Sequence, residues 1–530
     1  MKRVLWLLLS ALAAWPASAQ RDPDHLVVGA RAPIVSLDPA MSGLGSMHGY
    51  YRHIYDALVF RDPKSQPVPG LAESWRVVDP LTWEFRLRRG VLCHDGSPLD
   101  AADVAATLRR LPAVVGSDLL TVSKMRPVAE LQVVDPHTVR FRTREPYPGL
   151  LAALPELHIV CDSVPADAAT EDFNAGRAAI GSGPYRHAAW ERGARWELQR
   201  NDAWWGERPD FGRVSIREIT SDASRMAALE AGDVDLADYV PPMHVARFAA
   251  NERLEVFRAP SSRTIFLQFE SIREQTPFAT DRAGQPLPRN PFRDPKVRRA
   301  LALGVNGDAI VARTMEGLAV RATQGVPEGF PGFDPGIAAP RYAPDEARKL
   351  LAEAGFPNGF RLALHCSNNR YVNDGAICQA AAQMLARIGV ETSVEMLPTS
   401  IFFPRLIRRE FSAHLLGWGN ASGDAATFLR DVMASRDQAQ GLGSWNMATA
   451  DPELDRMVVE GTADMDLERR AASMAKAMRL VAERDYVLPL HAQLVVAATR
   501  RGLAYTPQAD ESTLAIAVRR RCGRASLGGA

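Results

Sequence analysis

Lysine is scarce in this sequence, and the motifs of three common enzyme classes are missing. Of the 63 basic residues only six are lysines, and none follows a glycine, so the Gly-Lys-Ser/Thr loop of Walker-type nucleotide sites is absent. No histidine precedes a glutamate, which excludes the HExxH zinc motif, and no GxSxG nucleophile elbow occurs. The eleven histidines are scattered, with no i, i+4 pair suited to a metal ion. We expect no catalytic residue, no metal site and no cofactor.

An excess of charge of one sign is also missing. The 63 basic residues balance 62 acidic ones, so the chain has neither a basic field for nucleic acid nor an acidic tail. Hydrophobic residues make up 46% and charged residues 24%, as in ordinary globular proteins, which excludes disorder and collagen-like character. The 530 residues suffice for two to four domains.

Long hydrophobic runs are confined to the N-terminus. A short positive region, Met1–Arg3, precedes the apolar stretch Val4–Trp15 and the small residues Ala17-Ser18-Ala19. This pattern predicts a secretory signal peptide over residues 1–19, cleaved before Gln20. A membrane anchor is the alternative, which the shortness of the stretch disfavours. No later stretch approaches 18 uncharged apolar residues, so we expect an exported, soluble, periplasmic protein.

The cysteine count is odd. Five cysteines remain after cleavage, at positions 93, 161, 366, 378 and 522, and an exported chain can form disulfides. Cys366 and Cys378 are closest in sequence. Both a bridge between them and a pair of buried thiols remain open, because the sequence does not show their geometry.

Strands and helices alternate along the chain, which predicts an α/β architecture in at least two lobes. The polar, proline-rich segment Thr276–Asp294 is typical of a loop that crosses between lobes. The clearest expected strands are His25–Ala30 and Thr82–Arg88, and the clearest expected helices are a segment capped by Asp100, Lys296–Val305, Asp345–Ala354, Asp374–Ile388 and one containing Met474, Met478 and Val481.

Short segments spread over the whole mature chain share the pattern of one family. They include Leu71-Ala72-Glu73-Ser74-Trp75, His94-Asp95-Gly96-Ser97-Pro98, Gly181-Ser182-Gly183-Pro184-Tyr185, Trp204-Trp205-Gly206, Ala231-Gly232-Asp233-Val234-Asp235, Val297-Arg298-Arg299-Ala300-Leu301 and Pro489-Leu490-His491. In this order they resemble the family 5 extracellular solute-binding proteins, the dipeptide, oligopeptide and nickel receptors of ABC importers.

The resemblance implies the fold and its division. We expect an α/β fold like that of type II periplasmic binding proteins, of the cluster C kind with an enlarged lobe I, and two lobes around a ligand cleft. Lobe I is expected at 20–264 with an inserted subdomain at about 61–180, lobe II at 265–488, and a return to lobe I over 489–530. The implied protein is a monomer that captures a peptide-like or anionic solute, closes on it and delivers it to membrane permease subunits, without binding nucleic acid.

The resemblance also names ligand-binding candidates in one loop. Arg370 and Tyr371 match, with a gap of one residue, an Arg and a Tyr at which the dipeptide receptors bind the ligand carboxylate. An Arg fork suits a carboxylate because two N–H groups meet two oxygens. Asn373 lies in the same strand-to-helix loop, which is a usual place for ligand contacts. A surface salt bridge is the alternative role for Arg370.

A second group of candidates lies around Trp418. In the peptide receptors this Gly-Trp run offers backbone groups to the ligand, and an Asp three residues after the Trp holds its α-amine. Here that position is Ala421, so the ligand either lacks a free α-amine or is held by another acid such as Asp424. Gly417, Trp418 and Asn420 complete the group, with core packing as the alternative for Trp418.

Met47 and His48 are two further ligand-binding candidates, because in the family the loop that holds them can face the cleft.

Alternative functions also remain open. Instead of an importer receptor, which is not an enzyme, the chain could be an exported hydrolase with an unrecognised site, or a binding module for a chemoreceptor or a chaperone-type role.

Overall fold

The computed structural model describes residues 22–117, 120–368, 370–420, 422–438, 440–447 and 449–521. The predicted signal peptide, Ala421 and Cys522 lie outside these residues. Within the described ranges, no helix is long and apolar enough to cross a membrane.

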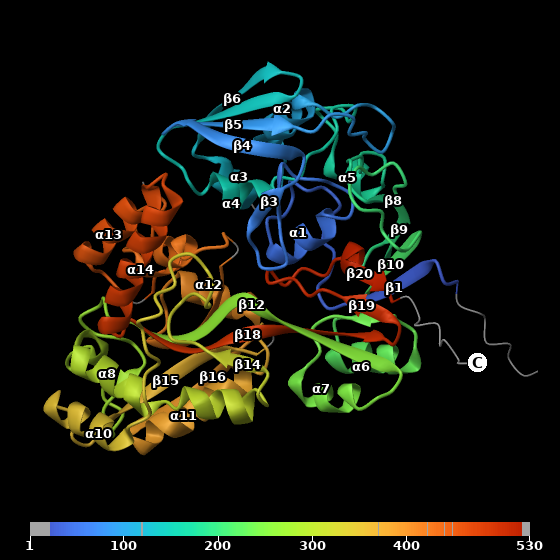
Figure 1. Cartoon of the computed structure of the whole chain (residues 1–530). Helices are drawn as coiled ribbons and strands as arrows, with labels where there is room; N and C mark the ends of the chain where they lie inside the picture. Colours follow the sequence, from blue (N-terminus) through green and yellow to red (C-terminus); the bar gives the residue numbers. More distant parts are fainter. Residues whose placement is uncertain are drawn as a thin grey trace, which may run out of the picture.

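A twelve-stranded sheet runs through the molecule (Figure 1), with the main path β13-β15-β17-β12-β18-β11-β1-β10-β9-β8. Its two longest strands are β12 (Leu254–Phe269) and β18 (Val487–Arg500), which pair antiparallel. One end of this pair lies beside β17 and the other beside β11. The two strands therefore connect two separately packed parts, which we name lobe I and lobe II.

Lobe II surrounds the β17 end of the sheet. Its strands are β13 (Ala279–Thr280), β14 (Ala319–Arg321), β15 (Phe360–Ser367), β16 (Val390–Leu397) and β17 (Ala413–Gly419). Apolar side chains on one face pack with α8 (Pro295–Gly304), α10 (Pro344–Glu353) and α11 (Asp374–Arg387). The other face packs with α12 (Thr399–Ile407), α13 (Pro452–Ala463) and α14 (Leu467–Glu483).

Lobe I surrounds the other end. Its strands are β1 (His25–Ala30), β8 (Tyr185–Glu191), β9 (Arg195–Arg200), β10 (Arg213–Glu218) and β11 (Leu236–Ala237), with helices α1 (Gly45–Tyr51), α6 (Asp222–Ala231) and α7 (Pro242–Ala249). The C-terminal strands β19 (Leu503–Tyr505) and β20 (Val518–Arg520) return here, and Tyr505 and Val518 join the lobe I core.

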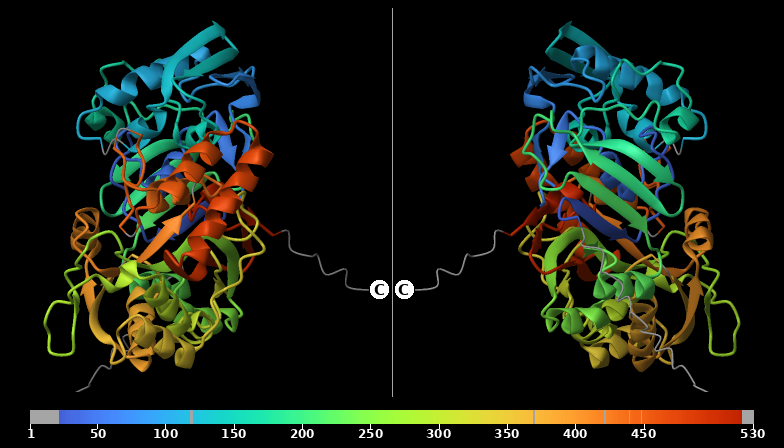
Figure 2. Two further views of the ribbon diagram at one scale, coloured as in Figure 1. Left: turned by 90° about the vertical axis from the view of Figure 1, so that its left-hand side faces the viewer. Right: turned by 90° about the vertical axis from the view of Figure 1, so that its right-hand side faces the viewer.

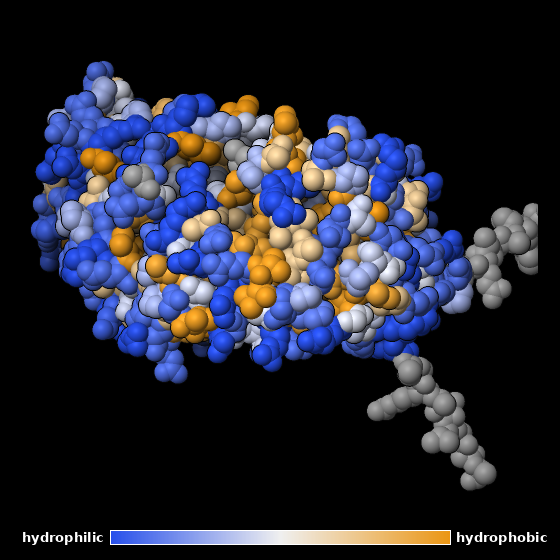
Figure 3. All heavy atoms as spheres, turned by 90° about the horizontal axis from the view of Figure 1, so that it is seen from above, coloured by the Kyte–Doolittle hydropathy of each residue, from blue (hydrophilic) through white to orange (hydrophobic). Residues whose placement is uncertain are grey.

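A second sheet within lobe I has its own core. The strands β4 (Ala72–Asp79), β5 (Thr82–Leu87), β7 (Thr138–Thr143) and β6 (Val128–Asp135) pair in that order, above α2 (Ala101–Arg110), α3 (Leu120–Met125) and α4 (Leu150–Ala153). Figures 1 and 2 show this subdomain at the opposite end of the molecule from α8, α10 and α11, while α13 and α14 of lobe II lie closer to it and Met465 between them packs against its core. Its face seen from above is mostly hydrophilic, with hydrophobic residues gathered nearer the middle of the molecule (Figure 3).

Most of the expected elements are present. The strand at His25–Ala30 is confirmed as β1, and Asp100 caps α2 with a side-chain bond to the Ala102 N–H. Asp294 likewise caps α8 through the Lys296 N–H, with Pro295 in the first turn. Met474, Met478 and Val481 are buried along α14, so that stripe is core. The lobe boundaries at 264/265 and 488/489 remain predictions.

The proline-rich segment is not the crossing. Ala279 and Thr280 pair with β15, and Ala279, Leu287 and Phe292 are buried in the lobe II core. The connection is instead made by β12 and β18, whose interstrand bonds hold the lobes together more firmly than a loop would. Polarity and proline content indicated a loop correctly but could not show which strand edge that loop covers.

Four cysteines form two disulfides. Cys366 on β15 bonds to Cys378 on α11, the pairing that the sequence left open. Cys93 bonds to Cys161 across 68 residues of the subdomain, a pairing that proximity in sequence did not indicate. The sulfur atoms of Cys93 and Cys161 also lie near Asp103, but because they are joined in a disulfide they offer no thiolate to a metal ion.

Three of the family-like motifs of lobe I have structural roles. His94 Nε2 lies 3.0 Å from the Gly183 carbonyl oxygen, and the His94 N–H donates to the Gly181 oxygen. A Cβ on Gly181 or Gly183 would lie within 2.6 Å of Ile54 backbone atoms, so both positions require glycine. The paired tryptophans Trp204 and Trp205 both donate their indole N–H to one buried carboxylate, Asp56, at 3.3 and 2.8 Å.

Candidate functional site

The loop that follows β15 is shaped by Asp374, the first residue of α11. Its Oδ2 accepts the backbone N–H groups of Arg370 and Tyr371 at 3.1 and 3.2 Å and the Ser367 hydroxyl at 2.9 Å. Asn373 has a positive φ of 56° and donates its side-chain amide to the Thr314 carbonyl at 2.8 Å. These hydrogen bonds hold the loop in place, and the bond from Asn373 to Thr314 attaches it to the rest of lobe II.

Arg370 and Tyr371 differ in their surroundings. Tyr371 is buried and donates its hydroxyl to the Gly417 carbonyl at 3.2 Å. Arg370 is exposed, and its guanidinium lies 5.4 Å from the Tyr371 ring centroid. No described carboxylate forms an ion pair with Arg370. The cation is therefore held over an aromatic ring with its hydrogen-bonding edge available.

Gly417 allows Tyr371 to reach this position. A Cβ at residue 417 would lie 2.6 Å from the Tyr371 ring and 2.5 Å from Ile265. Its carbonyl oxygen also accepts a bond from Arg263 Nη1 at 3.3 Å. The predicted residues Arg370, Tyr371 and Gly417 are thus brought together at one point of lobe II.

A largely buried ion pair from lobe I lies against this point. Glu511, in the C-terminal return, accepts bonds from Arg263 at 2.8 and 3.0 Å and from the Ser261 hydroxyl at 2.8 Å. Burial acts to raise the pKa of Glu511, but the charge and hydrogen bonds of Arg263, with a contribution from Arg370, lower that pKa to about 2. Glu511 therefore stays ionised at neutral pH, beside Arg370.

Three non-glycine residues with positive φ occur around this junction of the lobes: Tyr239 at 47°, Asn373 at 56° and Glu511 at 66°. Tyr239 donates its hydroxyl to the Glu511 carbonyl at 3.3 Å, and Arg31 lies over its ring at 5.4 Å. Strained backbone of this kind costs energy and gathers at binding sites. The junction between Tyr239, Glu511 and Arg370 is our candidate site.

Asn420 and Trp418, two of the predicted ligand-binding residues, have structural roles. Asn420 is fully buried and donates its amide to the carbonyls of Ser262 and Gly325. Trp418 donates its indole N–H to Thr427 at 3.3 Å and packs edge-on against Trp445. It is half-buried, so one part of its ring packs in the core of lobe II and the rest stays accessible.

Asp424 is not available as a substitute amine-binding acid. Its Oδ2 bonds to Arg470, a buried guanidinium on α14, and its Oδ1 accepts the Ser422 hydroxyl and the Ala426 N–H at 2.9 Å. The sequence could not reveal this because Arg470 is 46 residues away. Ala421 lies outside the described residues.

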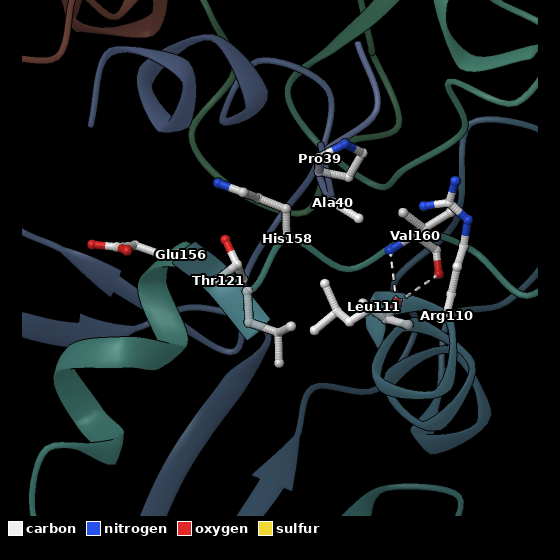
Figure 4. Close-up of a pocket in the computed structure, with 10 residues that line it drawn as sticks. Pro39, Ala40, Arg110, Leu111, Thr121, Glu156, His158 and Val160 are labelled. Carbon is white, nitrogen blue, oxygen red and sulfur yellow. Dashed lines mark hydrogen bonds between the residues drawn. The ribbon is translucent and has the colours of Figure 1, made fainter. Parts of the chain in front are cut away.

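Met47 and His48 lie inside lobe I and away from the junction. Met47 is buried in the lobe core, and His48 contacts the Gly43 carbonyl, His158 and Glu156 at 3.1–3.3 Å. A cavity of about 10 Å³ adjoins this network, with Thr121, Glu156 and His158 in its wall (Figure 4). A second cavity, of about 50 Å³, lies in lobe II beside Gln324 and Met478. Both are too small for a peptide-sized ligand.

The residues of lobe I at the junction escaped sequence reasoning. Arg263 and Glu511 are 248 residues apart, and neither belongs to a local motif. One local signal was present, since two serines and an arginine interrupt the apolar pattern of β12 at Ser261–Arg263.

Comparison with known proteins identifies the family. Residues 66–440 match the family described as "Bacterial extracellular solute-binding proteins, family 5 Middle". The chain belongs to family 5 of the bacterial extracellular solute-binding proteins. It is 27% identical over 439 residues to the glutathione-binding protein GsiB of Salmonella paratyphi A, a match that covers 81% of each chain. GsiB of Escherichia coli O1:K1 is 24% identical, over 93% of this chain and 94% of the relative.

Solved structures of other binding proteins share the fold. HbpA2 of Haemophilus parasuis aligns with a TM-score of 0.79 at 21% identity, over 94% of this chain and all of that one. A dipeptide-binding protein of Pseudoalteromonas, in complex with Met-Leu, aligns with a TM-score of 0.75 at 20% identity, over 94% and 100%. The family 5 chain thus has the two-lobed α/β fold of type II periplasmic binding proteins; cluster C remains a prediction.

Proposed function

We propose that this protein is the periplasmic receptor of an ABC importer and that it captures a peptide-like, anionic solute between its lobes. The observation that supports this is the Arg370 guanidinium, exposed at the lobe junction over Tyr371 and without a carboxylate partner among the described residues. Two N–H groups of Arg370 would bind the carboxylate of the solute, and lobe closure would bury it. Nothing covalent is required, so we propose a receptor rather than an enzyme.

The remaining assignments follow from the family and the sequence. The protein would be exported by the signal peptide at residues 1–19, act as a monomer and deliver its ligand to membrane permease subunits. We propose the lobe division 20–264, 265–488 and 489–530. The chain leaves lobe I along β12 near the first boundary and returns to it along β18 near the second. No cofactor and no nucleic acid is needed for this role.

The ligand class follows from the charges of the site. Asp424 is held by Arg470, and the amine-binding position of the dipeptide receptors is Ala421, so a free α-ammonium would find no carboxylate from this loop. Acidic or amine-blocked peptide-like solutes are therefore favoured over ordinary dipeptides. Glutathione keeps one free α-ammonium but carries two carboxylates, so it is net anionic, and because the curated relatives are named for binding it, it is the first solute to test.

A thermal-shift panel tests the function. We expect glutathione or another anionic peptide-like solute to raise the melting temperature, while a zwitterionic dipeptide such as Ala-Ala and a cationic one such as Lys-Lys do not. A shift given only by the cationic or the zwitterionic dipeptide would contradict the proposed ligand class. Turnover of a peptide or ester by the purified protein would instead support the hydrolase alternative.

A further inference from the structure

The lobe I residues that touch the candidate site belong to a bulge in β12. The β12–β18 pairing is interrupted between Pro260 and Thr264, so Ser261, Ser262 and Arg263 leave the regular ladder. Bulges redirect side chains and often lie beside binding sites. Here the bulge turns Arg263 toward Glu511 and the Tyr371 ring, whose centroid lies 5.9 Å from the guanidinium carbon.

The bulge bonds to both lobes at once. The Ser262 N–H donates to the Ala509 carbonyl of the C-terminal return at 2.8 Å, and the Ser262 carbonyl accepts the Asn420 amide of lobe II at 3.1 Å. Arg263 also bonds to both lobes, through its guanidinium group. Its Nε and Nη2 donate to Glu511, and its Nη1 donates to the Gly417 carbonyl at 3.3 Å.

A continuous series of bonds therefore leads from lobe I to the ligand loop. It runs from the Tyr239 hydroxyl to the Glu511 carbonyl, from the Glu511 carboxylate to Arg263, and from Arg263 to the Gly417 oxygen, which also accepts the Tyr371 hydroxyl. Arg370 also lies over the Tyr371 ring, 5.4 Å from its centroid.

We propose that Arg263 and Glu511 are positioning residues, which hold the Arg370–Tyr371 loop in its ligand-binding geometry and couple that geometry to lobe I. The inference rests on the proposed function. Glu511 itself does not bind the ligand, because its carboxylate oxygens are already bonded to Arg263, Ser261 and Gln493. The pair acts on the ligand through the position of Tyr371 and the contact between the lobes.

The direction in which Glu511→Gln changes the ligand affinity distinguishes a positioning role from a purely electrostatic one. Glu511 is negative and lies near Arg370, so removal of its charge would strengthen the binding of an anion if the charge alone mattered. If Glu511 positions Arg263 and Tyr371, the same change weakens binding. Glu511→Gln is therefore expected to weaken the binding of glutathione about tenfold or more, a change that corresponds to about 1.4 kcal/mol.

The chain offers a matched control pair. Asp38 and Arg110 form a bidentate pair at 2.8 and 2.6 Å, somewhat more buried than Arg263 and Glu511, with the guanidinium 4.2 Å from the Phe173 ring, but inside lobe I. We would measure calorimetric affinity for glutathione, melting temperature and the ligand-free radius of gyration by small-angle X-ray scattering. The variants are Glu511→Gln, Glu511→Asp, Arg263→Lys and the control Asp38→Asn; Glu511→Asp serves if the amide variant does not fold.

Three outcomes are informative. The proposal predicts that the Glu511 and Arg263 variants weaken binding and enlarge the ligand-free radius, while Asp38→Asn lowers only the melting temperature. Unchanged or tighter binding with an unchanged radius in Glu511→Gln would overturn it. If the parent protein itself does not bind glutathione, that ligand assignment fails, and the ligand-free radius alone decides: a radius equal to that of the parent overturns the proposal.

Discussion

At the scale of single residues, what matters is whether a charge already has a partner. The acids Asp424 and Glu511 are each bonded to an arginine, Arg470 and Arg263 respectively. Arg370 is exposed and lies over an aromatic ring, and it forms no ion pair with a carboxylate in the part of the chain that the structure describes. An unpaired cation at the junction of two lobes is the group best suited to recognise an anion.

The first prediction concerns this cation. Arg370→Ala is expected to weaken the binding of the anionic ligand about 30-fold or more, because a charge-assisted bidentate contact inside a closed site contributes about 2–5 kcal/mol. Calorimetric titration measures the change. The control is Arg192→Ala, which removes an exposed arginine stacked on Trp190 at 5.1 Å, far from the ligand loop. Equal affinities of both variants and the parent would show that Arg370 is an ordinary surface residue.

A pH prediction follows from Asp56. Burial raises the pKa of this carboxyl to about 7, against hydrogen bonds from Trp205, Ser182 and Trp204 that act to lower it. Since the folded pKa lies above the unfolded value of about 3.9, the stability contributed by the protonated form is present at low pH and is lost as pH rises toward 7.

We therefore expect the melting temperature of the parent protein to fall between pH 4 and pH 7 relative to that of Asp56→Asn. Calorimetric scans of the two proteins at matched ionic strength check this. Parallel pH profiles of the two proteins would mean that Asp56 is ionised in the folded state throughout this range.

At the scale of elements, local signals in the sequence predicted much of the fold. The caps at Asp100 and Asp294 and the short buried run His25–Ala30 located α2, α8 and β1, because these signals lie within a few residues of one another. The Arg370–Tyr371 loop was instead indicated by the resemblance to the family, and its ligand-binding role stays a prediction. The partners Arg263, Arg470 and Glu511 were not predicted, because long-range pairing of charges leaves no local pattern.

Gly417 provides a prediction about the ligand loop. Gly417→Ala places a methyl group 2.6 Å from the Tyr371 ring, so the ring must move and its bond to the Gly417 carbonyl must weaken. We expect a loss of about 1–3 kcal/mol in the free energy of unfolding, as for other overpacked sites, together with weaker ligand binding. Gly45→Ala is the control, since no atom lies within 4 Å of its Cβ position. Denaturant titrations that give both variants the same stability would contradict this account.

The two disulfides should differ in what they contribute. Removing Cys93–Cys161, which closes a loop of 68 residues, is expected to cost about 1.5 kcal/mol more than removing Cys366–Cys378, which closes 12. Paired alanine variants compared by denaturant titration test this order. A larger loss from the Cys366–Cys378 pair would indicate that strain or packing, and not chain entropy, dominates.

At the scale of the whole molecule, the lobes also touch at a point next to the β12 bulge, because the Gly423 N–H donates to Asn420, which bonds to Ser262. The Gln66 amide of lobe I donates to the Gly423 carbonyl of lobe II at 3.3 Å, and a Cβ on Gly423 would lie 2.5 Å from the Ser65 carbonyl. Because Gly423 also has a positive φ of 75°, any side chain there would strain the backbone and press the lobes apart.

Gly423→Ala is therefore expected to favour the open arrangement and to enlarge the ligand-free radius of gyration. Ligand binding should also be weaker, because closing the lobes around the ligand then costs more free energy. Scattering and calorimetry on the same samples measure both. Gly502→Ala is the control, because it has a positive φ of 90° but no atom within 4 Å of its Cβ position. An effect on stability alone, equal in the two variants, would contradict a role in closure.

The central claim is that the protein holds an anionic solute between its lobes through Arg370. Mass spectrometry of the small molecules that stay bound during purification from the native periplasm tests it most directly, with the parent protein and Arg370→Ala prepared side by side. We predict that the parent retains a peptide-like solute with at least one carboxylate and that Arg370→Ala loses it. A cationic solute in the parent, or the same solute retained equally by the variant, would contradict the account.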